Sequence, residues 1–135
     1  MPNLKQMVML ASLFAVSAAF PAASAELATQ KSSERGVTVA VTPQELSSDA
    51  RTWDFKIVLD THSGDLSDDL LKTAVLLDAT GTQYAPVAWD GAAPGGHHRE
   101  GVLKFKPVSP TPATIELQIK RVGEANPRTF RWQLK

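Results

Sequence analysis

Trp53-Asp-Phe-Lys-Ile-Val-Leu-Asp60 places large apolar side chains at every second position, with polar residues or Val58 between them. Alternate residues of a β-strand point to opposite faces of a sheet, so this stretch predicts a strand with one buried face. An amphipathic helix would instead need apolar residues three and four positions apart. The stretch therefore favours β-structure, and the segments around it decide the fold class.

The same alternation recurs on both sides of this stretch. Valines occupy every second position of residues 37–41, and residues 115–120 and 130–135 also alternate apolar with polar side chains. Shorter apolar runs predict further strands at residues 74–78, 83–89 and 102–106. Turn-forming residues separate about seven strands, and no long helical period is present. We expect an all-β fold, an antiparallel immunoglobulin-like or fibronectin-III-like β-sandwich.

The N-terminal segment has a different character. Lys5 precedes an apolar run that ends at Phe20, which is shorter than the about 20 residues needed to cross a membrane. Pro21 and the small residues before Glu26 complete the pattern of a cleavable secretory signal. We therefore expect a signal peptide at residues 1–25, a flexible polar leader at 26–35 and the β-sandwich domain at 36–135.

Cysteine content and charge limit the classes of partner. The chain contains no cysteine, which excludes disulfides, thiolate zinc sites and a lipid-modified cysteine at the cleavage site. Loss of the signal with Lys5 would leave 13 basic against 14 acidic side chains. This balance gives no electrostatic reason to expect nucleic acid or an anionic membrane as partner. We expect a periplasmic or secreted protein, without membrane insertion after cleavage.

The histidines fall in two predicted loops. His62 follows the strand quoted above, and His97 and His98 lie in the glycine-rich and proline-rich residues 90–101. Imidazole binds copper and zinc well, and adjacent histidines in a glycine-rich loop can turn toward one ion. The alternative is that these histidines only fix the geometry of the loops. The candidate ligands for Cu(II) or Zn(II) are His62, His97, His98, Asp60 and Asp90.

Trp89 is the tryptophan most suited to a surface role, because it ends a strand beside the glycine-rich loop. Trp53 and Trp132 alternate with polar residues and are expected in the core. We predict Trp89 and Arg99 as contacts for a protein partner of unknown identity. No nucleophile elbow, phosphate-binding loop or dinucleotide fingerprint is present, so we expect no enzymatic activity.

Four segments carry a resemblance to a protein family. They follow the pattern D-T-H-S…W-D-G…G-G-H-H-R…G-V-L-x-F, at residues 60–63, 89–91, 95–99 and 101–105. The chain resembles small uncharacterised exported bacterial proteins with this pattern. The resemblance implies no activity and no catalytic residues, but it implies that the histidine loops are a recurring feature.

Together these observations predict a non-enzymatic extracytoplasmic binding module. The more specific prediction is that the module binds a transition metal, copper or zinc, through the loop histidines. The alternative is a structural or protein-interaction β-sandwich domain, in which the histidine loops are purely structural.

Overall fold

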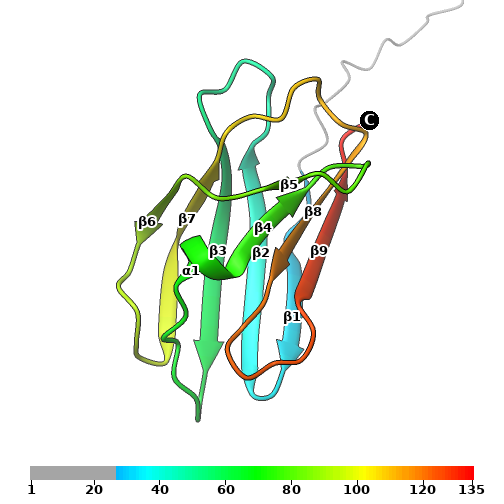
Figure 1. Ribbon diagram of the computed structural model, residues 1–135. Helices are drawn as coiled ribbons and strands as arrows, with labels where there is room; N and C mark the ends of the chain where they lie inside the picture. Colours follow the sequence, from blue (N-terminus) through cyan, green and yellow to red (C-terminus); the bar gives the residue numbers. More distant parts are fainter. Residues whose placement is uncertain (1–26) are drawn as a thin grey trace, which may run out of the picture.

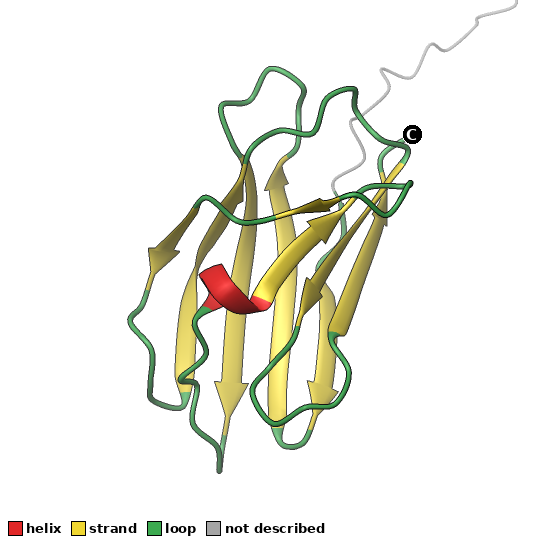
Figure 2. Cartoon of the chain, viewed as in Figure 1, coloured by secondary structure: helices red, strands yellow, loops and turns green. Residues whose placement is uncertain are grey.

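The computed structural model describes residues 27–135, so the predicted signal peptide lies outside the described residues. These residues form two antiparallel sheets and one short helix, which confirms the all-β prediction (Figure 1 and Figure 2). The elements in chain order are β1 (Gln30–Glu34), β2 (Val37–Glu45), β3 (Trp53–Thr61), α1 (Leu70–Thr73), β4 (Ala74–Leu77), β5 (Gln83–Tyr84), β6 (Ala88–Gly91), β7 (His98–Phe105), β8 (Thr114–Ile119) and β9 (Arg128–Gln133).

The two sheets form separate layers that face each other (Figure 2). The first sheet has the strand order β1-β2-β3-β7-β6, and the second has the order β5-β4-β8-β9. Each sheet turns its apolar side chains toward the other, so the inward residues of both sheets form one hydrophobic cluster. In this way the period-2 pattern of the sequence becomes a shared core.

The alternating stretch Trp53–Asp60 lies within β3, at the centre of this core. The side chains of Trp53, Phe55 and Ile57 are completely buried. The ring of Phe55 lies 5.6 Å from that of Phe105 in its own sheet and 5.7 Å from that of Trp132 in the other. Aromatic contacts of this kind add to the stabilisation from burial alone, so Phe55 joins the two layers.

One prediction about local structure needs correction. Residues 30–34, expected within the flexible leader, form β1 and pair with β2 along their whole length. The sequence pattern missed β1 because this strand carries no apolar side chain. The short helix α1 begins after Asp69, whose carboxylate accepts a hydrogen bond from the backbone N–H of Leu71.

The strand count also differs from the about seven expected. Besides the added β1, the predicted strand at residues 83–89 is two strands, β5 and β6, which lie in different sheets. The chain crosses between the layers near Pro86, a residue that cannot donate a backbone hydrogen bond to a sheet. No helix within residues 27–135 is long and apolar enough to span a membrane.

Candidate functional site

Four connecting segments meet at one end of the molecule, which we call the loop end. They are the β3–α1 loop (62–69), the β6–β7 loop (92–97), the β8–β9 loop (120–127) and the turn between β1 and β2, and Figure 1 shows them together at the lower end. Backbone hydrogen bonds connect the first two: the N–H of Thr61 donates to His97 O at 2.9 Å, and that of Gly95 donates to Leu66 O at 2.9 Å.

Arg99 ties the same two loops together from inside. It lies in β7 and points inward, with only 2% of its surface exposed. Its guanidinium donates to Ala92 O at 3.2 Å, and to the carbonyl oxygens of Leu66 and Asp68. A guanidinium carries five donors in a fixed plane, so one side chain can hold carbonyl groups from two loops at once.

Trp89 covers the guanidinium of Arg99, whose central carbon lies 5.2 Å from the centre of the indole ring. The indole N–H donates to Ala92 O at 3.0 Å. Gly91 and Gly101 lie opposite each other in β6 and β7, and a Cβ atom on Gly101 would come within 2.6 Å of the indole. The two glycines thus make the space in which the indole packs.

Arg121 joins the β8–β9 loop to the β3–α1 loop. Its Nε donates to Oδ2 of Asp68 at 2.7 Å, and its Nη2 donates to Asp65 O at 3.2 Å. The side chains of Arg121 and Asp68 are 8% and 2% exposed. A charged pair with so little contact with water interacts strongly, because screening by solvent is weak.

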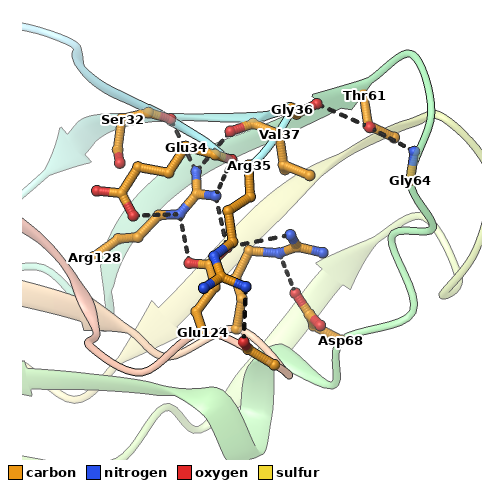
Figure 3. A network of polar contacts seen from close by, with 12 residues as sticks. Ser32, Glu34, Arg35, Gly36, Val37, Thr61, Gly64, Asp68, Glu124 and Arg128 are labelled. Atoms are coloured by element: carbon orange, nitrogen blue, oxygen red, sulfur yellow. Dashed lines mark hydrogen bonds and ion pairs between the residues drawn. The ribbon is translucent and has the colours of Figure 1, made fainter.

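Arg128 and Glu124 complete this set of buried charges (Figure 3). The guanidinium of Arg128 donates to both carboxylate oxygens of Glu124, at 2.9 and 2.8 Å. It also donates to the carbonyl oxygens of Ser32, Glu34 and Val37, at 3.0, 2.9 and 2.8 Å. Arg128 therefore connects the second sheet to the β1–β2 hairpin of the first.

We call the five buried charged residues at this end the arginine network. Hydrogen bonds from Arg128 lower the pKa of the Glu124 carboxyl, and the positive charges of Arg128 and Arg121 lower it further against the opposing effect of burial. Nη1 of Arg121 lies 3.5 Å from Glu124 Oε2, which makes the contacts continuous from Asp68 to Arg128. The members of the network are Arg99, Arg121, Arg128, Asp68 and Glu124.

His98 belongs to β7 and not to a loop, which corrects its predicted position. Adjacent residues of a strand face opposite sides, so His98 points to the outer face while Arg99 points inward. Nδ1 of His98 lies 2.5 Å from Oδ1 of Asp60, and Nε2 lies 3.4 Å from Oε2 of Glu100. The hydrogen bond to Asp60 and then that to Glu100 raise the pKa of His98.

The remaining candidate ligands are distributed over two regions. His62 and His97 are both exposed at the loop end. The backbone N–H of Thr61, the residue before His62, donates a hydrogen bond to the carbonyl oxygen of His97. Asp90 lies opposite Val102 of β7, four residues along the strand from His98. That separation corresponds to about 13 Å, at about 3.3 Å per residue. Within residues 27–135, no three histidine, aspartate or glutamate side chains form a group that could hold a metal ion.

The two predicted partner contacts face the interior of the molecule. Trp89 is half-buried and packs against the core, and Arg99 is buried beneath it. We therefore assign both residues a structural role in holding the β6–β7 loop. This position follows from register, because Trp89 is paired with the buried Leu103 and so lies on the inward face.

Sequence reasoning missed four members of the arginine network, although a signal was present. Arg121 follows Ile119 by two positions, and Arg128 precedes Phe130 by two positions. Residues two positions apart in a strand point to the same face. Each arginine therefore continues the buried face one position beyond the last apolar residue on it. An arginine in that position indicates a buried cation at the end of a core, for which carboxylate or carbonyl partners are needed.

We predict that Glu124→Gln lowers the free energy of unfolding at pH 7 by about 3 kcal/mol, since it leaves the buried guanidinium of Arg128 without its buried carboxylate. The lowered pKa of Glu124 means that the charged form stabilises the fold above the pKa of the unfolded chain, and that this stabilisation is lost as the pH falls through the folded pKa. Urea unfolding from pH 7 to pH 3 should show the difference from the wild type shrinking toward acid pH. A pH-independent difference would contradict this account.

The matched control is Glu116→Gln, which removes a carboxylate from an ion pair with the exposed Arg131 at 2.8 Å. Because the Arg131 side chain is 73% exposed, solvent screens this pair and its contribution is about 0–1 kcal/mol, so the variant should unfold close to the wild type at pH 7.

Gly101→Ala should destabilise the protein by about 1–3 kcal/mol, because the new methyl group overlaps the indole of Trp89 and also approaches the Cα of Gly91. Urea unfolding measures the loss. Combining the change with Trp89→Leu removes the overlapping ring, so the double variant should lose less than the sum of the two single variants. Strict additivity would show that the glycine does not serve the indole.

Asp60→Asn should lower the pKa of His98, because the carboxylate is the main cause of the raised value. An NMR titration of the imidazole resonances measures the change. The raised pKa also means that the pair stabilises the fold fully below the pKa of an unfolded histidine, and that this contribution is lost as the pH rises through the folded pKa. Asp90→Asn is the control and should leave the titration of His98 unchanged.

Comparison with known proteins adds no relative from which a role could be transferred. No protein-family model, no curated protein and no solved structure matches the chain.

Proposed function

We propose that the chain is a non-enzymatic extracytoplasmic binding module that recognises a protein partner with its loop end. The observation that carries the proposal is the arginine network, whose hydrogen bonds hold three loops and a hairpin in one arrangement. Loops that carry recognition are commonly positioned by a rigid scaffold. Export rests on the signal-peptide pattern of residues 1–25, which favours a periplasmic or secreted location.

An immunoglobulin-type sandwich is the finer form of the fold that we infer. The order β2-β3-β7-β6 beside β5-β4-β8-β9 corresponds to the A-B-E-D and C′-C-F-G strands of immunoglobulin domains. On this assignment β1 is an additional N-terminal strand. The β3–α1 and β8–β9 loops then correspond to the B–C and F–G loops, which bind antigen in variable domains. The correspondence is an analogy of fold, and it favours the loop end as the recognition surface.

Preorganisation explains why buried charges would serve recognition. Association requires flexible loops to become ordered, at about 0.5–1.5 kcal/mol for each immobilised side chain. Loops that are already tied to Arg99 and Arg121 avoid part of that cost. Their outer side chains remain available to a partner: His62 and His97 are exposed, and Val122 is 77% exposed.

Protein recognition is a better proposal than Cu(II) or Zn(II) binding for two reasons. Both ring nitrogens of His98 already face carboxylates, and Asp90 belongs to a different part of the sheet. An enzymatic role is also less favoured, because the buried arginines, which could stabilise a developing negative charge, donate their hydrogen bonds to the protein itself.

Photocrosslinking in living cells tests this proposal. A photoreactive residue placed at His97 or Val122 should give a discrete crosslinked product, because both positions lie on the loop end. The control position is Ser48, an exposed residue in the connection between β2 and β3 at the opposite end of the molecule (Figure 1). Products from Ser48 but from neither loop-end position would refute the proposal, as would equal products from all three.

A further inference from the structure

β1 is a strand that contributes no apolar side chain to the core. Its five residues are Gln-Lys-Ser-Ser-Glu, of which only Gln30 and Ser32 are even half-buried. Burial of apolar surface is the main source of stability in most strands, so β1 must be held in another way. Its pairing with β2 supplies main-chain hydrogen bonds along its whole length.

Polar contacts from the second sheet hold the other side of β1. Arg128 binds the carbonyl oxygens of Ser32 and Glu34, at 3.0 and 2.9 Å. The carboxamide of Gln30 accepts a hydrogen bond from the N–H of Arg131 at 3.0 Å and donates one to the carbonyl oxygen of the same residue. β1 therefore lies between two strand edges, and each of its contacts would form equally well with an identical strand from another molecule.

The turn that connects β1 to β2 favours such an exchange. It consists of Arg35 and Gly36, with φ angles of 50° and 74°. Two positive φ angles are typical of a type I′ turn, in which asparagine, aspartate or glycine normally occupy the first position. Arginine has a side chain that disfavours the left-handed conformation. Opening the turn into a continuous strand relieves this strain, and short strained hinges are known to promote strand exchange.

We propose that β1 is exchanged between two copies of this chain. In the resulting two-fold dimer each β1 pairs with β2 of the other copy, and each Arg128 binds the carbonyl groups of the exchanged strand. The arginine network is then complete in both copies, so the loop end is preserved and presented twice. Because the closed turn holds β1 at a high effective concentration, exchange depends strongly on protein concentration. This inference does not depend on the proposed function.

A cysteine pair across β1 and β2 tests the exchange. Ser33 and Thr38 lie directly opposite each other, and their hydroxyl oxygens are 2.9 Å apart. The natural chain has no cysteine, so Ser33→Cys with Thr38→Cys introduces the only thiols. The protein, purified as the cell processes it, is equilibrated at a series of concentrations, oxidised and separated on non-reducing gels. A covalently linked two-chain product should increase with concentration.

The control pair is Lys56→Cys with Val102→Cys, which bridges β3 and β7 and should link within one chain at every concentration. A Ser33–Thr38 pair that also links only within one chain, up to the highest concentration reached, would overturn the proposal. Equal interchain linking by both pairs would also overturn it, since that result reflects random collision.

A second variant tests the same exchange without cysteines. Deleting Arg35 alone leaves one residue between Glu34 and Val37, so the two-residue turn cannot form, while these two residues stay on one face of the joined strand. In its present register β1 can then pair with β2 only in another molecule. Light scattering should then give twice the mass of one chain. A folded monomer would contradict the proposal.

A third variant returns to the cysteine pair. Arg35→Gly relaxes the turn, so in the Ser33→Cys/Thr38→Cys protein it should lower the fraction of the covalently linked two-chain product.

Discussion

The hydrogen bonds of three buried guanidinium groups are the interaction on which the loop end depends. Arg99, Arg121 and Arg128 lie where the apolar core ends, and each donates to backbone carbonyls of segments far away in the sequence. Loops usually have few buried contacts and are the least stable parts of a domain. At this end of the molecule the arginines replace the missing apolar contacts, so the loops are fixed by polar chemistry.

Fixing the loops with buried charged groups has a cost in desolvation free energy. Moving charges out of water costs several kcal/mol for each ion, and the pairing of charges only partly offsets that cost. Asp68 and Glu124 supply two carboxylates for three arginines, and carbonyl oxygens accept the remaining hydrogen bonds. Apolar residues in place of a buried ion pair often give similar or higher stability, so stability alone does not explain why the charges are kept. Retaining the charges is consistent with a surface whose exact shape matters, which is what recognition by loops requires.

The sequence predicted the buried central strands well, but it predicted the edge strand β1 and the start of β7 poorly. Alternation over β3, β8 and β9 located the buried strands, because burial imposes that pattern directly. β1 was missed since its stability comes from main-chain and polar contacts, which leave no hydrophobic pattern. His98 and Arg99 were predicted as loop residues because glycines precede them, whereas pairing with β3 extends β7 to His98. The strand thus begins four residues earlier than predicted, at His98 instead of residue 102, and its alternation turns His98 outward and Arg99 inward.

The arginine network should make the loops at this end as rigid as the sheets. NMR order parameters of the backbone amides measure this most directly on the fast timescale. The account predicts values near 0.85 in the β3–α1, β6–β7 and β8–β9 loops, similar to those of β3. In Arg99→Met, which removes the guanidinium and keeps an apolar side chain, the β6–β7 loop should fall toward about 0.6 while β3 is unchanged. Values below about 0.6 in the loops of the wild-type protein would contradict the account.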